Sequence, residues 1–190
     1  MNTTPIKYAV ATVGFYVGYR LFMLADSGAG VNNIGDDLLS TVQTAMSDAD
    51  FKGRFSPIDP KTGEDYSALI YSASREYGMP SLLLAAQLKQ ESGFNHQAYN
   101  RISGAMGLAQ FMPATATEWG VKPYDPKSAI DGCAKYMRWL WRRHGTWRLA
   151  VAAYNWGTGN VQKKGIAAMP TETRNYVAVI YDKWASVLPA

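Results

Sequence analysis

The sequence predicts a mainly α-helical fold, in which a helical domain follows a single N-terminal transmembrane helix and a spacer. Three observations predict it. Apolar residues recur with helical spacing from residue 65 onward, no convincing alternating strand pattern occurs, and one long apolar run lies near the N-terminus. We therefore expect a membrane anchor at residues 1–27, a spacer at residues 28–64 and one folded domain at residues 65–190.

The anchor is predicted from residues 6–25, which are almost all apolar and are interrupted by Lys7 and Arg20. A run of about 20 apolar residues matches the thickness of a bilayer, and the long side chain of Arg20 can reach the interface. Because positive residues favour the cytoplasmic side, Lys7 predicts that the following domain lies on the periplasmic side. A cleaved signal peptide and a buried core helix are the alternative interpretations.

The spacer is predicted from residues 26–64, in which Gly, Asp, Asn, Ser and Pro are frequent. Such a composition favours a flexible connection, although residues 38–46 have the pattern of one amphipathic helix. The domain should begin where this composition ends, at residue 65.

Five helices are predicted in the domain from apolar spacing and from residues that favour helix ends. Proline favours the first helical turn, glycine follows the last residue, and threonine is a good N-cap. On these signals the helices begin near Tyr66, Pro80, Pro126, Thr146 and Thr171, and the first two end before Gly78 and Gly93.

Composition argues against several classes of site. The single cysteine, Cys133, cannot form an internal disulfide, and with only His96 and His144 it does not give the usual spacing of zinc ligands. Its apolar neighbours predict a buried thiol. We expect no metal and no other cofactor. The net charge of +4 suits an anionic envelope, but the arginines at residues 138–148 alternate with tryptophans that are expected to pack inward, so no nucleic-acid partner is expected.

Glu91 is the candidate catalytic residue, because it lies at the end of an apolar helix directly before a glycine turn. Partial loss of water and the negative potential of a helix C-terminus both favour the protonated carboxyl and raise its pKa. A general acid that cleaves a glycosidic bond needs a proton near neutral pH. Position alone favours an exposed glutamate at a helix end.

Two later segments carry residues that suit a sugar. In residues 103–113, glycines permit close backbone approach, Gln110 can hydrogen-bond a hydroxyl or an amide, and Met112 offers an apolar surface. In residues 152–160, the aromatic ring of Tyr154 precedes the amide of Asn155. Each feature alone is also explained by a helix cap, a turn or a core tyrosine.

Four sequence blocks, taken together and in order, resemble the soluble lytic transglycosylase family. They are ESGFN at residues 91–95, SGAMGLAQFMPATA at 103–116, AAYNWGTGNV at 152–161 and ETRNYV at 172–177. This family belongs to the lysozyme-like superfamily and is similar to goose-type lysozyme. The resemblance runs from about residue 66 to residue 180, and His96 departs from it by standing where the family often has proline.

The resemblance implies a lysozyme-like helical domain that cleaves the glycan strands of peptidoglycan, with Glu91 as the single catalytic acid. It further implies substrate-binding roles for Ser103 beside the glycan, Gln110 and Met112 along the sugar cleft, Tyr154 and Asn155 near the acid, and Glu172 and Tyr176 in the element that closes the cleft.

The count of carboxylates favours a non-hydrolytic mechanism. Hydrolytic glycosidases mostly use two carboxylates, whereas the other acids between residues 81 and 160 are Glu118, Asp125 and Asp131, none of which lies in a matched block. One carboxylate suffices if the acetamido group of the muramic sugar assists. The C6 hydroxyl of that sugar would then close a 1,6-anhydro ring, as the resemblance implies.

Other interpretations stay open: a goose-type hydrolase, a non-enzymatic glycan-binding module, and a membrane structural protein within a larger assembly. Wall remodelling, a secretion or conjugation machine, and a bacteriophage virion all employ such domains. Components of a virion or a secretion complex are therefore further expected partners.

Overall fold

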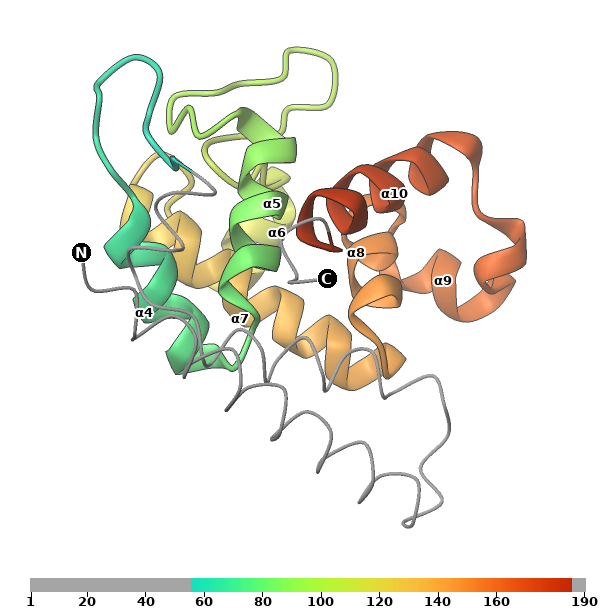
Figure 1. Cartoon of the computed structure of the whole chain (residues 1–190). Helices are drawn as coiled ribbons and strands as arrows, with labels where there is room; N and C mark the ends of the chain where they lie inside the picture. The colour runs from blue at the N-terminus through green and yellow to red at the C-terminus, as the bar shows by residue number, and fades with distance from the viewer. Residues whose placement is uncertain (1–55, 186–190) are drawn as a thin grey trace, which may run out of the picture. The chain divides into compact units, whose positions relative to one another are not determined.

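The computed structural model describes residues 56–185, in which the helices pack around α5 (Figure 1). In chain order the elements are α4 (Ser67–Tyr77), α5 (Ser81–Ser92), α6 (Pro113–Trp119), α7 (Pro126–His144), α8 (Trp147–Trp156), α9 (Thr158–Lys164), the short 3-10 helix η2 (Ile166–Ala168) and α10 (Thr171–Ala185). Between the described helices the chain forms only isolated β-bridges.

The helix α5 lies in the core because its first two turns are buried on every side. All eight residues from Ser81 to Leu88 are buried, and α5 packs against α4, α7 and α10. A helix that is apolar all round requires neighbours on all sides. Pro80 precedes it, and it ends at Gly93, whose φ of 62° is left-handed. Glu91 is therefore carried at the end of the most enclosed helix of the domain.

The helix α7 packs against α5, and α8 packs between α7 and α10. The buried face of α7 includes Ile130, Met137 and Cys133, so the prediction of a buried thiol is confirmed. The helix α8 packs against both α7 and α10. Its N-cap is Thr146, as predicted, whose hydroxyl accepts a hydrogen bond from the backbone N–H of Leu149 at 3.2 Å.

The five predicted helices correspond to α4, α5, α7, α8 and α10, with differences at two starts. The N-cap of α7 is Asp125, whose carboxylate accepts from Ser128 N at 2.7 Å, and Thr171 is the first residue of α10 rather than its cap. The seven-residue helices α6 and α9 are not among the predicted helices. They are too short to show a helical period in the sequence.

The predicted fold class needs one correction. The described chain is mainly helical, as predicted, but no helix within residues 56–185 is long and apolar enough to cross a membrane. The longest of them, α7, has 19 residues and carries charged side chains from Lys127 to Arg143. The predicted fold class was therefore wrong in including a transmembrane helix. The fold class that the structure supports is a mainly helical domain. Residues 6–25, from which it was predicted, lie outside the described residues, as do residues 28–55 of the predicted spacer.

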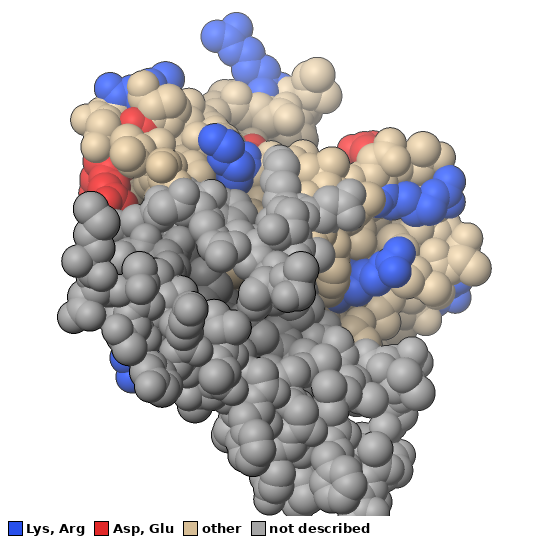
Figure 2. All heavy atoms as spheres, in the orientation of Figure 1, with Lys and Arg blue, Asp and Glu red and all other residues tan. Residues whose placement is uncertain are grey.

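The charges of the described surface are mixed. On the face seen in Figure 2, Lys and Arg side chains are dispersed among uncharged residues and do not merge into one patch. A groove that follows a nucleic-acid backbone would gather them along one line. This face therefore gives no support to the nucleic-acid alternative.

Candidate active site

The carboxyl group of Glu91 is half-buried and meets side chains from its own helix and from α10. The hydroxyl of Tyr176, on α10, donates a hydrogen bond to Oε1 of Glu91. The amide Nε2 of Gln87, one turn earlier on α5, lies 3.2 Å from the same oxygen and 2.5 Å from the Tyr176 hydroxyl. These three side chains are called the Glu91 triad below. Both hydrogen bonds to the carboxyl group end on Oε1, which leaves Oε2 for a substrate oxygen.

The surroundings of Glu91 hold a proton near neutral pH. Burial disfavours the charged carboxylate and raises the pKa from 4.5 to about 7, although the hydrogen bond from Tyr176 acts in the opposite direction. A carboxyl group with such a pKa can give a proton to a leaving group and take one back at neutral pH. A pKa in this range is what a general acid requires at neutral pH.

Tyr154 anchors the loop between α5 and α6 to the helices. Its hydroxyl donates to the carbonyl oxygen of Ala109 at 2.7 Å, and its ring packs against Phe111 and Tyr136 with centroids 6.2 Å and 5.5 Å away. Burial, followed by the nearby ionisable groups of Cys133 and Glu91, raises the pKa of this phenol well above its usual range. The phenol is therefore neutral and fixes the backbone that follows the catalytic helix.

The loop of residues 93–112 is held by short polar contacts rather than by regular structure. The hydroxyl of Ser92 donates to the carbonyl of Leu108 at 2.8 Å, and the amide of Gln110 donates to the carbonyl of Gly107 at 2.9 Å. At Gly107, φ is 72° and a Cβ atom would lie 1.7 Å from the carbonyl oxygen of Pro123. Only glycine fits at this close approach.

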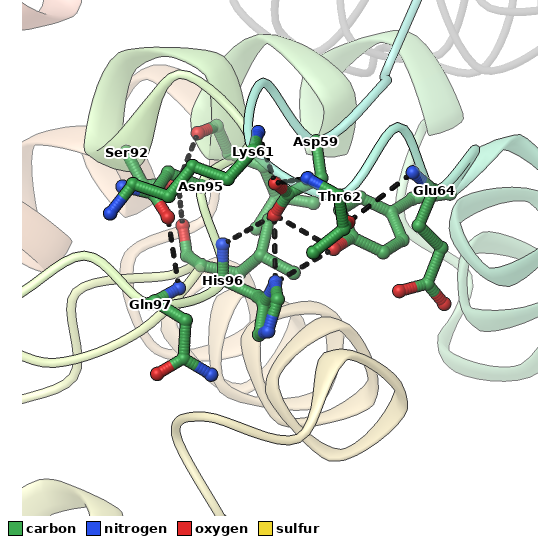
Figure 3. A network of polar contacts seen from close by, with 11 residues as sticks. Asp59, Lys61, Thr62, Glu64, Ser92, Asn95, His96 and Gln97 are labelled. Carbon is green, nitrogen blue, oxygen red and sulfur yellow. Dashed lines mark hydrogen bonds and ion pairs between the residues drawn. The ribbon is translucent and has the colours of Figure 1, made fainter.

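A second network joins this loop to the segment before α4 (Figure 3). The carboxylate of Asp59 is 1% exposed and accepts hydrogen bonds from the backbone N–H groups of Lys61, Thr62 and His96 at 2.8, 3.0 and 2.9 Å. Its Oδ2 also lies 2.7 Å from Nδ1 of His96 and accepts from the hydroxyl of Tyr66 at 3.0 Å.

Burial alone would raise the pKa of Asp59. The hydrogen bonds from His96, Thr62 and Lys61 outweigh this effect and hold that pKa well below its usual range. The carboxylate therefore stays charged and fixes His96, five residues after Glu91. The residue that departs from the family pattern thus has a structural partner.

The remaining acids near α5 in the sequence are placed elsewhere. Asp125 caps α7, Asp131 pairs with Lys127 at 2.5 Å, and Glu118 is exposed on α6. Among the described residues, none of the three has a hydrogen bond or ion pair with Glu91. The site as described therefore offers one carboxyl group for chemistry.

The described residues do not bring metal-binding side chains together. Within residues 56–185, no group of three His, Cys, Asp or Glu side chains could hold a metal ion. His96 pairs with Asp59, and the Nε2 atom of His144 lies 2.8 Å from the hydroxyl of Thr158. Both imidazoles thus have protein partners.

Comparison with known proteins decides the family. A model of the Transglycosylase SLT domain family matches residues 68–177, which is more than half of the chain. The chain belongs to this family. The resemblance drawn from the four sequence blocks is thus confirmed.

Individual relatives of this family match only in part of their length. The transglycosylase of Enterobacteria phage PRD1 is 40% identical over 90 residues, which cover 47% of this chain and 34% of the phage protein. The membrane-bound lytic murein transglycosylase C of Edwardsiella ictaluri is 32% identical over 121 residues, which cover 53% of this chain and 33% of that protein. The chain therefore spans about a third of the length of these curated relatives.

A solved structure shows the same fold. The structure of an inactive mutant of the lytic transglycosylase Slt from Pseudomonas aeruginosa matches with a TM-score of 0.58 and 24% identity, over 79% of this chain and 27% of that one. At this identity the match establishes the fold. The helical arrangement around α5 is accordingly that of a lytic transglycosylase.

The residues expected to bind substrate in this SLT domain lie at different depths. Tyr176 touches Glu91, and Glu91 is close enough to Tyr154 to contribute to the raised pKa of that phenol. Among the described residues, no hydrogen bond joins the other five to Glu91. They are Ser103, Gln110, Met112, Asn155 and Glu172.

Each of these five has a definite local setting in the SLT domain. Ser103 is exposed in the loop, where its hydroxyl accepts from the N–H of Ala105 at 3.3 Å, and Met112 is 45% exposed at the start of α6. The side-chain amide nitrogen of Gln110 donates a hydrogen bond to the loop backbone. Asn155 is exposed, with its amide oxygen accepting from Thr173 at 2.9 Å. Glu172 is exposed in the first turn of α10.

Sequence reasoning missed Gln87, which completes the Glu91 triad. A signal was available, because residues four apart on a helix lie on one face and Gln87 is a polar residue within an apolar run. It also missed Ser92 and Thr173, whose hydroxyl groups hold the loop and Asn155. No pattern in the sequence distinguishes these two hydroxyl groups from ordinary ones.

Proposed function

We propose that this SLT domain cleaves the β-1,4 bond between N-acetylmuramic acid and N-acetylglucosamine in peptidoglycan, without water, and leaves a 1,6-anhydromuramic end. The observation that carries this proposal is the single half-buried carboxyl group of Glu91, with its pKa raised by burial to about 7 and with Tyr176 as partner. Family membership supports the substrate and the reaction class.

In the first step, Glu91 gives its proton to the glycosidic oxygen and the bond to the anomeric carbon of the muramic sugar breaks. The carbonyl oxygen of the sugar's own acetamido group stabilises the positive charge that develops on that carbon, which replaces the second carboxylate. The released glucosamine end carries the new hydroxyl. Glu91 is now ionised, and the hydroxyl of Tyr176 stabilises this form.

In the second step, the carboxylate of Glu91 removes the proton from the C6 hydroxyl of the muramic sugar. The C6 oxygen bonds to the anomeric carbon, the acetamido group is released, and Glu91 is protonated as at the start. Every proton is returned, and neither water nor metal is consumed.

The substrate-binding roles are proposals of the same kind. Exposure supports contact with a glycan for Ser103, Met112 and Asn155, and Glu172 lies one turn before Tyr176 on α10. Tyr154 and Gln110 would shape the site through the loop that they hold. Alanine at Ser103, Met112 or Asn155 should raise KM for glycan strands more than it lowers kcat.

Digestion of purified peptidoglycan tests the reaction. The wild-type chain should release muropeptides with anhydro ends, and Glu91→Gln should lose at least about 100-fold in rate while staying folded. Glu118→Gln, which removes an exposed carboxylate from α6, is the matched control and should keep activity. Near-normal activity of Glu91→Gln would end the proposal. In the P. aeruginosa Slt structure, a glutamate-to-glutamine mutant is described as inactive, which supports the choice of residue.

The alternative enzyme is a hydrolase similar to goose-type lysozyme, which would leave reducing ends heavier by one water. The site with one carboxyl group disfavours it. A non-enzymatic glycan-binding component would keep the exposed amide and apolar residues, but the raised pKa of Glu91 would then serve no purpose. Release of anhydro muropeptides by the wild-type chain excludes both.

We propose that the domain acts at the cell wall and that a bacteriophage virion or a secretion machine employs it. The similarity to a phage transglycosylase supports the first of these users. Detection of the native protein in purified virions would establish it, and recovery with host envelope fractions alone would refute it. The boundaries at residues 27 and 64 stay a prediction, and the contacts of Asp59 support a folded part that begins before residue 65.

A further inference from the structure

Gln87 is the one amide side chain among the buried polar residues of the described chain, and it lies in an apolar helix. It is fully buried within α5, between Leu84 and Leu88, which are buried as well. An amide in such surroundings is unfavourable unless it is hydrogen-bonded. A methionine of nearly the same size would fill the position at less cost. The amide therefore needs an explanation beyond packing.

The hydrogen bonds of Gln87 are unevenly used. Its nitrogen Nε2 donates to the hydroxyl of Tyr176 at 2.5 Å and to Oε1 of Glu91 at 3.2 Å. Its oxygen Oε1 is buried and has no hydrogen-bond partner among the described residues. A buried acceptor without a partner is uncommon and calls for an explanation, of which a catalytic role is one. The Nε2 atom of this amide is thus hydrogen-bonded, whereas its Oε1 atom is an acceptor without a partner, near the carboxyl group of Glu91.

The proposed reaction requires Glu91 in two forms. The carboxylate only accepts hydrogen bonds, whereas the carboxyl group also has a proton to donate. The hydroxyl of Tyr176 carries a single hydrogen. An amide has a donor end and an acceptor end, and a half-turn about its last bond exchanges them. With Nε2 toward the site, Gln87 supports the carboxylate. Before a substrate oxygen is bound at Oε2 of Glu91, the amide oxygen of Gln87 can instead accept a proton carried on Oε1 of the carboxyl group.

We propose that Gln87 is a positioning residue that hydrogen-bonds Glu91 in both of its protonation states and keeps the triad in one geometry throughout the reaction. This inference rests on the proposed function, in which Glu91 acts first as acid and then as base. Among residues 56–185, neither of the other polar side chains near Glu91 takes this role: the hydroxyl of Tyr154 is bound to the carbonyl of Ala109, and burial keeps the thiol of Cys133 protonated by raising its pKa.

The kinetic test compares Gln87→Met with Gln90→Met on purified glycan strands. Gln90 is the matched control because it is an exposed glutamine on the same helix. Gln87→Met should lower kcat about tenfold to hundredfold, the loss expected for hydrogen bonds to a charged group. Its KM should stay within about twofold, because a fully buried side chain does not touch the glycan. An unchanged kcat, or a rise in KM that accounts for the loss, would overturn the assignment.

A titration without substrate tests the two-state role. In chains with ¹³C-labelled glutamate carboxyl groups, NMR should show the pKa of Glu91 in Gln87→Met within about half a unit of the wild-type value, because support is lost in both forms. Tyr176→Phe removes the hydroxyl that donates to the carboxylate and leaves the Gln87 amide beside Glu91, so it should raise that pKa clearly. A rise in Gln87→Met equal to that in Tyr176→Phe would show that the amide serves the carboxylate alone, which refutes the proposal.

The two experiments separate this inference from the proposed function. If the wild-type chain releases no anhydro muropeptides, the proposed function fails, while the titration still reports on the triad. If the wild-type chain is active and Gln87→Met keeps its kcat, only the role of Gln87 fails. The midpoint temperature of thermal unfolding should be near or above the wild-type value in Gln87→Met, because the buried acceptor without a partner is removed. This measurement also shows that the kinetic comparison uses folded protein.

Discussion

Replacing Glu91 with glutamine should stabilise the protein at about pH 8 and change its stability little near pH 4. In the folded chain the pKa of Glu91 is raised by burial from 4.5 to about 7. Between these values the folded state holds a proton that the unfolded state has released. The free energy of unfolding of the wild type therefore falls as the pH rises through this interval and is constant above it. Glutamine has no proton to release and avoids this loss.

The magnitude follows from the same interval. Each pH unit between the two pKa values costs about 1.4 kcal/mol, so the interval from 4.5 to about 7 corresponds to at most about 3–4 kcal/mol. The oxygen of the new glutamine can accept from Tyr176 and Gln87 in place of Oε1, but a neutral amide oxygen is a weaker acceptor than a carboxylate, which reduces the gain. We expect a net stabilisation of about 1–3 kcal/mol above pH 7.

The assay is urea unfolding at several values between about pH 4 and pH 8, followed by tryptophan fluorescence, with m-values compared at each pH. Glu118→Gln is the matched control, because it removes an exposed carboxylate whose interactions are screened by solvent. A stability difference between Glu91→Gln and wild type that does not grow from about pH 4.5 to pH 7 would refute the argument that burial keeps this carboxyl group protonated.

Three further predictions concern the supports of the site. Tyr176→Phe should raise the pKa of Glu91 and move the basic limb of the kcat/KM profile upward by about one pH unit, because the phenol stabilises the charged form. Asp59→Ala should lower the free energy of unfolding by about 3 kcal/mol in chemical denaturation, because it leaves several buried donors without their acceptor. Gly107→Ala should cost at least about 2 kcal/mol, since its Cβ would lie 1.7 Å from a backbone oxygen, whereas Gly104→Ala, with φ of 78° and open space, should cost about 1 kcal/mol.

Each of these predictions has an outcome that contradicts it. A basic limb that stays in place in Tyr176→Phe would mean that the phenol does not set the pKa of the acid. Equal unfolding curves for Asp59→Ala and wild type would show that the hydrogen bonds of Asp59 do not contribute to the stability of the folded domain. Equal costs for the two glycine variants would show that backbone conformation, and not the close approach at Gly107, makes glycine necessary there.

The acid dependence of the Asp59 network has the opposite sign to that of Glu91. Hydrogen bonds hold the pKa of Asp59 well below its usual range, so its contribution to stability is complete above the unfolded pKa of about 4. That contribution is lost as the pH falls further. Below about pH 4, the free energy of unfolding should therefore fall more steeply with decreasing pH in the wild type than in Asp59→Ala.

Much of the helical frame could be predicted because its signals are local. The apolar run of α5, the proline before it and Gly93 after it are read directly from neighbouring residues. The position of Glu91 at the end of an apolar helix made a raised pKa a hypothesis, but the burial that raises it depends on the packing of other helices. In contrast, helices of seven residues such as α6 and α9 are stabilised by contacts rather than by a period in the sequence.

The contacts that complete the site could not be predicted because they join distant segments. Tyr176 reaches Glu91 only when α10 packs against α5. Asp59 belongs to a stretch whose composition indicates a spacer, yet it is buried against His96, 37 residues later. The amide nitrogen of Gln110 hydrogen-bonds the loop backbone, a contact that the sequence pattern did not indicate. In each case tertiary packing, which a local pattern does not record, decides the partner.

The account depends on a cleavage that one carboxyl group completes without water. Digestion of peptidoglycan in water enriched in ¹⁸O, followed by mass spectrometry of the muropeptides, measures this directly. We predict muramic ends lighter by one water than reducing ends and free of the heavy isotope. Muramic ends that carry ¹⁸O would show that water attacks the anomeric carbon, and would contradict the central role given to Glu91 as both acid and base.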